Sequence, residues 1–136
     1  MSTSQLLSGR MALVTGAGQG NGRAIALGLA AHGADVVVTD IDTVAAQQTA
    51  DDVSARGRRG WSYTLDVTDA DACAALAKTV GAEIGPVAIL VNNAGIIIRE
   101  TIDSPRAHDN WRRVLDVNLN GVFNVTHAFL PALRQT

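Results

Sequence analysis

Short runs of aliphatic and β-branched residues alternate along this chain with longer stretches of helical periodicity. The clearest run, 35–39, contains three consecutive valines, and such an uninterrupted apolar run is typical of a strand covered on both faces. Further strands are expected at 11–15, 61–65 and 87–91, each followed by a helical stretch. Because this alternation requires right-handed crossovers between parallel strands, it predicts an α/β fold with helices on both faces of a parallel sheet.

The helical stretches have recognisable ends. Thr68, with Asp71 three residues later, is expected to open one helix as a capping box. Ser104 is expected to cap the last helix, with Pro105 at its first position, after a loop over 96–106. The expected helices cover 21–31, 43–56, 68–83 and the stretch from Pro105 to Arg134.

Chain length and charge limit the classes of protein that fit. The 136 residues suffice for one hydrophobic core, so we expect a single domain over 1–136. A net charge of −2 gives no electrostatic reason to bind nucleic acid, and no stretch offers the roughly 18 apolar residues of a membrane span. Residues 1–7 lack a basic region followed by a long apolar run, so no signal peptide is expected and the cytoplasm is the default location.

The single cysteine, Cys73, lies in an alanine-rich helical stretch. One cysteine can form neither an internal disulfide nor a thiolate metal cluster. We therefore expect Cys73 to be a small buried apolar residue rather than a reactive thiol.

Ligands of open parallel sheets bind beyond the carboxyl ends of the strands, and the first such end is rich in glycine. The stretch Thr15-Gly16-Ala17-Gly18-Gln19-Gly20-Asn21-Gly22 allows a tight turn and lets backbone N–H groups approach a phosphate. A flexible glycine loop would look the same, but here a strand precedes the stretch and a helix follows it, which favours phosphate binding. The spacing matches neither G-x-G-x-x-G nor a Walker loop.

Asp40 follows the second expected strand. A carboxylate in this position can accept hydrogen bonds from both hydroxyls of an adenosine ribose and would repel a 2′-phosphate. Asp40 could instead cap the next helix, but Asp42 is better placed to do so, which would leave Asp40 free. No basic residue stands at Gln19 or Ile41, so we expect NAD rather than NADP.

The other two strand ends are less specific by themselves. Asp66-Val67 follows the third strand and could accept from a purine amine, although an aspartate there could equally be a turn residue. Asn92-Asn93-Ala94-Gly95 follows the fourth, where asparagine side chains could tie neighbouring loops together. An isolated turn could have the same sequence.

Taken in order, these sites resemble the short-chain dehydrogenase/reductase family over nearly all of residues 8–135. The glycine loop resembles its T-G-x-x-x-G-x-G motif, 92–95 its N-N-A-G motif, and Val117-Asn118-Leu119-Asn120-Gly121 its V-N-x-x-G helix segment. Asn21 stands where the family more often has an aliphatic residue. The resemblance implies cofactor contacts at Gly16, Gln19, Gly20, Asn21, Gly22, Asp40, Ile41, Asp66, Val67, Asn93, Ala94 and Gly95.

The resemblance also implies a three-layer Rossmann-type fold with strand order 3-2-1-4, lacking the C-terminal strands and helices of the full fold. It implies a catalytic role for Asn118, whose family counterpart kinks its helix and holds a water on a proton relay. Family catalysis also needs a Ser and a Tyr-x-x-x-Lys, and neither Tyr63 nor Lys78 can be reassigned to that motif. We therefore expect this chain alone to be inactive.

The complete protein is expected to move hydride between NAD and a small alcohol or ketone, with this chain supplying the cofactor-binding half. The final helix carries apolar residues on more than one side, as a helix would that also packs on further parts of the protein or on a partner subunit. For the complete protein a homodimer or homotetramer is expected. Alternatives are a naturally short nucleotide-binding module and a degraded loop that serves only assembly. The intact glycines and Asp40 count against the last alternative.

Overall fold

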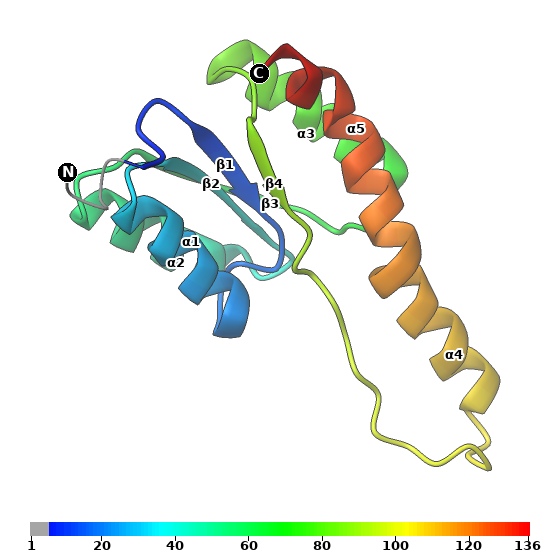
Figure 1. Cartoon of the computed structure of the whole chain (residues 1–136). Helices are drawn as coiled ribbons and strands as arrows, with labels where there is room; N and C mark the ends of the chain where they lie inside the picture. The colour runs from blue at the N-terminus through cyan, green and yellow to red at the C-terminus, as the bar shows by residue number, and fades with distance from the viewer. Residues whose placement is uncertain (1–5) are drawn as a thin grey trace.

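The computed structural model describes residues 6–136, which form three layers (Figure 1). Four parallel strands make one sheet in the order β3-β2-β1-β4, and this confirms the predicted α/β class and strand order. The first five residues, on which the targeting expectation partly rests, lie outside the described part of the chain. The strands are β1 (Met11–Val14), β2 (Asp35–Asp40), β3 (Gly60–Thr64) and β4 (Ile89–Val91).

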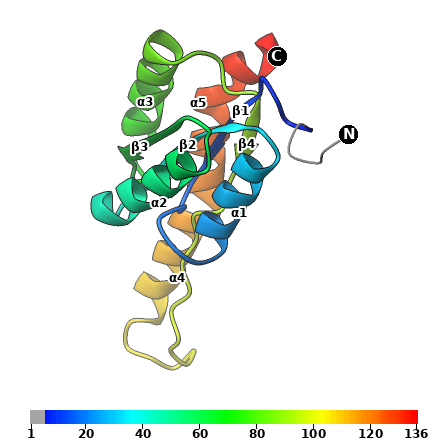
Figure 2. The same cartoon turned by 90° about the vertical axis from the view of Figure 1, so that its left-hand side faces the viewer.

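Helices cover both faces of this sheet (Figure 2). The first two pack on one face and the third and last on the other, so the core has two halves. The helices are α1 (Gly20–Ala31), α2 (Thr43–Ala55), α3 (Ala70–Glu83), α4 (Ala107–Leu115) and α5 (Gly121–Gln135). A π-helical segment, η2 (Asp116–Asn120), joins α4 to α5, so the single helix expected from Pro105 onward is interrupted.

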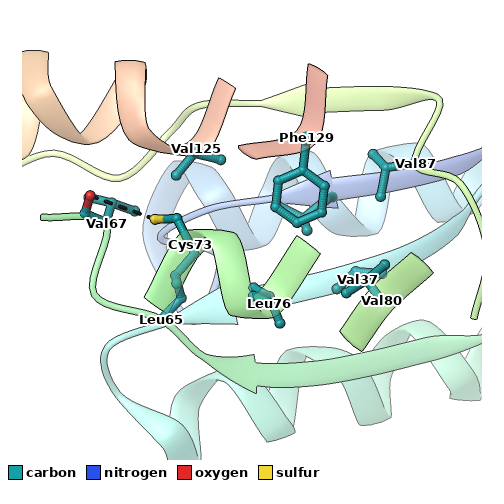
Figure 3. Close-up of a cluster of buried hydrophobic side chains, with 10 residues drawn as sticks. Val37, Leu65, Val67, Cys73, Leu76, Val80, Val87, Val125 and Phe129 are labelled. Atoms are coloured by element: carbon teal, nitrogen blue, oxygen red, sulfur yellow. Dashed lines mark hydrogen bonds between the residues drawn. The ribbon is translucent and has the colours of Figure 1, made fainter. Parts of the chain in front are cut away.

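Successive residues of the central strands point their side chains into opposite halves of the core. Val36 and Val38 face α1 and α2, whereas Val37 joins Phe129 of α5 in the other half (Figure 3). All three valines are fully buried, which confirms the expectation of a strand covered on both faces. β4 is shorter than expected and begins at Ile89.

Cys73 lies inside the core half formed by α3 and α5 (Figure 3). Its Sγ is 3.8 Å from the carbonyl oxygen of Val67. Burial raises the pKa of the Cys73 thiol, and the carboxylates of Asp69 and Asp66 raise it further. The expectation of a buried residue is confirmed, and its lack of reactivity stays a prediction.

Two expected helix caps are wrong. Asp69 rather than Thr68 caps α3, because its carboxylate accepts from the backbone N–H of Ala72 at 3.0 Å, while the Thr68 N–H and hydroxyl both bind Asp66. Ser104 does not cap α4, which begins at Ala107. The Ser104 hydroxyl accepts from the N–H of Arg106 in the preceding turn.

The cap of α2 is as expected. Asp42 accepts from the backbone N–H of Ala45 at 3.0 Å. Within residues 6–136, no helix combines the length and apolar character needed to cross a membrane.

Candidate functional site

The loop between β1 and α1 takes its shape from glycines. Gly16 and Gly20 have φ angles of 59° and 58°, in the left-handed region that side chains disfavour. At Gly22, a Cβ atom would lie 2.2 Å from the carbonyl oxygen of Gly16 and 2.4 Å from Nδ2 of Asn93. The helix start therefore approaches the loop after β4 more closely than any other residue type would allow.

Thr15, at the end of β1, ties the same two loops together. Its buried hydroxyl accepts from the N–H groups of Asn93 and Ala94, each at 3.0 Å. The Asn93 side chain donates to the carbonyl of Gly16 at 3.0 Å, as expected of an asparagine linking neighbouring loops. Thr15 was not among the expected site residues, although its place between a strand and the glycine loop is the signal that identifies it.

As expected, Asp40 does not cap α2, but its carboxylate already accepts hydrogen bonds from within the chain. Its Oδ2 accepts from the N–H of Gly18 at 2.8 Å, and its Oδ1 accepts from the N–H of Asp42 at 2.9 Å. The contact forms because Gly18 has no Cβ, which would lie 2.9 Å from Oδ2. Since an ionised carboxylate offers about four acceptor positions, both oxygens can still accept hydrogen bonds from a ligand.

A cleft of about 460 Å³ opens where the strand ends meet. Its charged lining groups are the carboxylates of Asp40 and Asp66, and among the described residues no Lys, Arg or His lines it. Three further apolar residues line it: Leu65, Ile96 and Val117. The expected residues that line it are Gly16, Gln19, Asn21, Asp40, Ile41, Asp66, Val67, Asn93, Ala94 and Gly95.

Three expected site residues lie outside the cleft wall. Gly20 and Gly22 shape the loop behind it. Asn118 lies in η2, where its Oδ1 accepts from the Ile96 N–H at 2.8 Å and its Nδ2 donates to the Ile96 carbonyl at 2.9 Å. Its amide thus fixes the backbone of a lining residue, while its relay role stays a prediction.

Comparison with known proteins gives the context of this geometry. Residues 10–136 match the family model described as short chain dehydrogenase. The chain belongs to the short-chain dehydrogenase family. Proteins of this family use NAD(P) and are oxidoreductases.

Two curated relatives illustrate the similarity. The chain is 47% identical over 117 residues to the Mycobacterium tuberculosis protein described as "Probable oxidoreductase EphD", covering 85% of this chain and 19% of that protein. It is 35% identical over 130 residues to cyclohexanol dehydrogenase from an Acinetobacter strain, covering 96% of this chain and 52% of the relative. This chain thus spans about half, or less, of the length of these relatives.

Among solved structures, a short chain dehydrogenase from Shigella flexneri in complex with NADP superposes with a TM-score of 0.90 at 29% identity. The match covers 98% of this chain and 57% of that one. The present fold therefore corresponds to about half of a short-chain dehydrogenase.

The tyrosine and lysine of this short-chain dehydrogenase chain lie away from the cleft. The Tyr63 hydroxyl donates to Glu83 at 3.3 Å, and its pKa is raised by burial and by the Glu83 carboxylate. Lys78 lies on α3. Within the described part of the chain, neither residue lines the cleft, and no group of His, Cys, Asp and Glu is arranged to hold a metal ion.

Proposed function

We propose that the complete protein is an NAD-dependent oxidoreductase that interconverts an alcohol and its carbonyl compound, and that this chain supplies the cofactor-binding half. The observation that carries the proposal is the Asp40 carboxylate at the cleft, held in place by two backbone N–H groups. No cationic side chain lines the described cleft beside it. A ribose with free hydroxyls suits this environment, whereas a 2′-phosphate would face an uncompensated negative charge.

The remaining lining residues fit the other parts of a dinucleotide. Backbone N–H groups of the glycine loop and the start of α1 would hold the pyrophosphate. Asp66 and Val67 would contact the adenine, and no described residue donates to Asp66 Oδ2, so that oxygen could accept from the purine amine. Asn93, Ala94 and Gly95 would border the nicotinamide side. When bound, oxidised NAD would itself accept the hydride from the alcohol.

We propose that the general acid/base groups come from residues outside these 136. Tyr63 is engaged with Glu83, and no described lysine reaches the cleft. Residues 1–136 expressed alone should bind NAD weakly and oxidise no alcohol. Tight binding of NAD by a soluble monomer without turnover would instead favour the short nucleotide-binding module. A homodimer or homotetramer and a cytoplasmic location remain our expectations for the complete protein.

The cofactor preference tests the proposal directly. The complete enzyme should use NAD at least tenfold better than NADP, a difference of about 1.4 kcal/mol, and Asp40→Ala should narrow that gap. The ratio of kcat/KM values for the two cofactors measures it. Asp109→Ala serves as the control, because it removes the same charge from a residue that does not line the cleft. Equal use of both cofactors by the unmutated enzyme would refute the proposal.

A further inference from the structure

The carbonyl of Val67, in the part of the cleft wall that follows β3, receives a hydrogen bond from a distant helix. Asn124 of α5 donates from Nδ2 to the Val67 oxygen at 2.9 Å. The contact is partly buried and joins residues separated by 57 positions in the sequence. Asparagine is slightly unfavourable inside a helix, so a specific tertiary partner gives it a physical reason to be there.

Gly121 of α5 makes a second, independent contact with the same residue. A Cβ atom at Gly121 would lie 2.5 Å from Cγ2 of Val67 and 3.1 Å from its Cβ. Gly121 and Asn124 are three residues apart and so share one helix face. The backbone of α5 therefore approaches Val67 closely, and the amide of Asn124 sets the direction of its carbonyl.

Val67 has little freedom to respond to a change in these contacts. Its side chain belongs to the core and is 7% exposed, and Cys73 approaches its carbonyl from α3. On the cleft side, the adjacent Asp66 is fixed through Thr68, whose N–H and hydroxyl both bind Oδ1. The α5 contacts hold Val67, and the turn at Thr68 holds the neighbouring Asp66. Because Val67 itself lines the cleft, a shift of Val67 would change the cleft wall.

We propose that Asn124, together with Gly121, is a positioning residue. It holds the Asp66–Val67 wall in the position from which this wall recognises the purine base of a bound dinucleotide. The inference rests on the proposed NAD-binding function and extends it to base recognition. Asn124 lies outside the cleft and acts through Val67. Loss of its donor leaves the partly buried carbonyl with only the weak thiol contact, and the wall is expected to relax away from the base.

The test compares the dissociation constants of NAD and nicotinamide hypoxanthine dinucleotide, measured by calorimetry on the full-length protein. The second compound lacks the adenine amine, so a displaced wall should affect it less. Asn124→Leu, which keeps the branched shape of the side chain and removes the donor, and Gly121→Ala, which pushes on Val67, should each weaken NAD binding by about tenfold. Binding of the hypoxanthine compound should change by less than about twofold.

Asn120→Leu is the matched control, because Asn120 is exposed and its amide binds only Asp116 within the helical segment. It should alter neither dissociation constant. If both variants lower the melting temperature but weaken the two dinucleotides equally, the role of Asn124 is merely structural and the inference is wrong. Equal binding of the two compounds by the unmutated protein would also overturn it. Absence of NAD binding by the unmutated protein would refute the proposed function and this inference together.

Discussion

The sheet region, residues 11–91, and the segment 96–120 contain similar apolar residues in very different environments. Strand valines such as Val37 are fully buried, whereas no residue between 96 and 120 is buried. Ile102 is 95% exposed and Trp111 is 67% exposed. Figure 1 shows the loop and α4 extending away from the layers that enclose the sheet.

An apolar pattern therefore predicts burial only where another layer of the fold covers it. Parallel strands receive helices on both faces through their own crossovers, so the sheet region encloses its apolar residues with nearby sequence. The segment 96–120 is held instead by hydrogen bonds, such as those between Asn118 and Ile96 and those around Glu100. Stability should therefore depend on packing in one region and on polar contacts in the other.

The largest expected effect uses two phenylalanines of α5, the helix that leads from the segment back to the sheet. Phe129 is 1% exposed and Phe123 is 66% exposed. Phe129→Ala should lower the free energy of unfolding by about 3–5 kcal/mol, because it removes apolar contacts and leaves a cavity. Phe123→Ala should change it by no more than about 0.5 kcal/mol.

Chemical denaturation of both variants in the full-length protein measures the contrast. A large loss for Phe123→Ala would show that this end of α5 is covered in the complete protein. The contrast in burial between the two regions would then hold only for residues 1–136.

A second, smaller contrast concerns two glycines of α1. Gly22→Ala should cost about 1–3 kcal/mol, since its Cβ would collide with the Gly16 carbonyl and Asn93, and it should weaken cofactor binding. Gly28→Ala should instead stabilise by about 0.5–1 kcal/mol, because nothing lies within 4 Å of its Cβ position. Thermal melts of the two variants check the signs, and a stabilising Gly22→Ala would contradict the close packing of Gly22 against the Gly16 carbonyl and Asn93.

Asn118 lies where the segment joins α5, and its substitution tests the proposed relay. Asn118→Ala in the complete enzyme should lower kcat by about tenfold and leave the NAD dissociation constant nearly unchanged, because a proton relay serves the chemical step. Asn120→Ala, two residues along the same segment, should leave both quantities unchanged. A normal kcat for Asn118→Ala would exclude the role.

The smallest expected effect is the pH response of the segment. Hydrogen bonds from Arg106, Ser104 and Asn110 lower the pKa of Glu100 from its ordinary value of 4.5 to about 2. Because the folded pKa is depressed, the stabilisation is present above about pH 4.5 and is lost as the pH falls toward 2. The protection factors of the amides over 100–110, which correct for the intrinsic pH dependence of exchange, should fall across this window, while Glu100→Gln should show lower protection already at neutral pH and respond less to acid.

The sequence alone was sufficient to predict the layers and the place of the cleft. Valine runs identify strands buried on both faces. Glycines directly after β1 identify a loop whose backbone angles and close contacts disfavour residues with a Cβ atom. Asp42 was also predictable as a cap, because capping is a contact between near neighbours in sequence. These features follow from local chemistry and from the handedness of strand crossovers.

Contacts between segments far apart in the sequence hold the cleft together, and these follow only from the tertiary structure. The Thr15 hydroxyl binds backbone groups some 78 residues away, the Gly18 N–H engages Asp40, and Asn124 reaches Val67. None of these partners can be read from spacing, because each depends on which segments the fold brings side by side. Thr68 shows the same limit at short range, since its N–H and hydroxyl both donate to the Asp66 carboxylate and Asp69 caps the helix instead. Spacing predicts which residues can form a contact, and only the folded geometry selects among them.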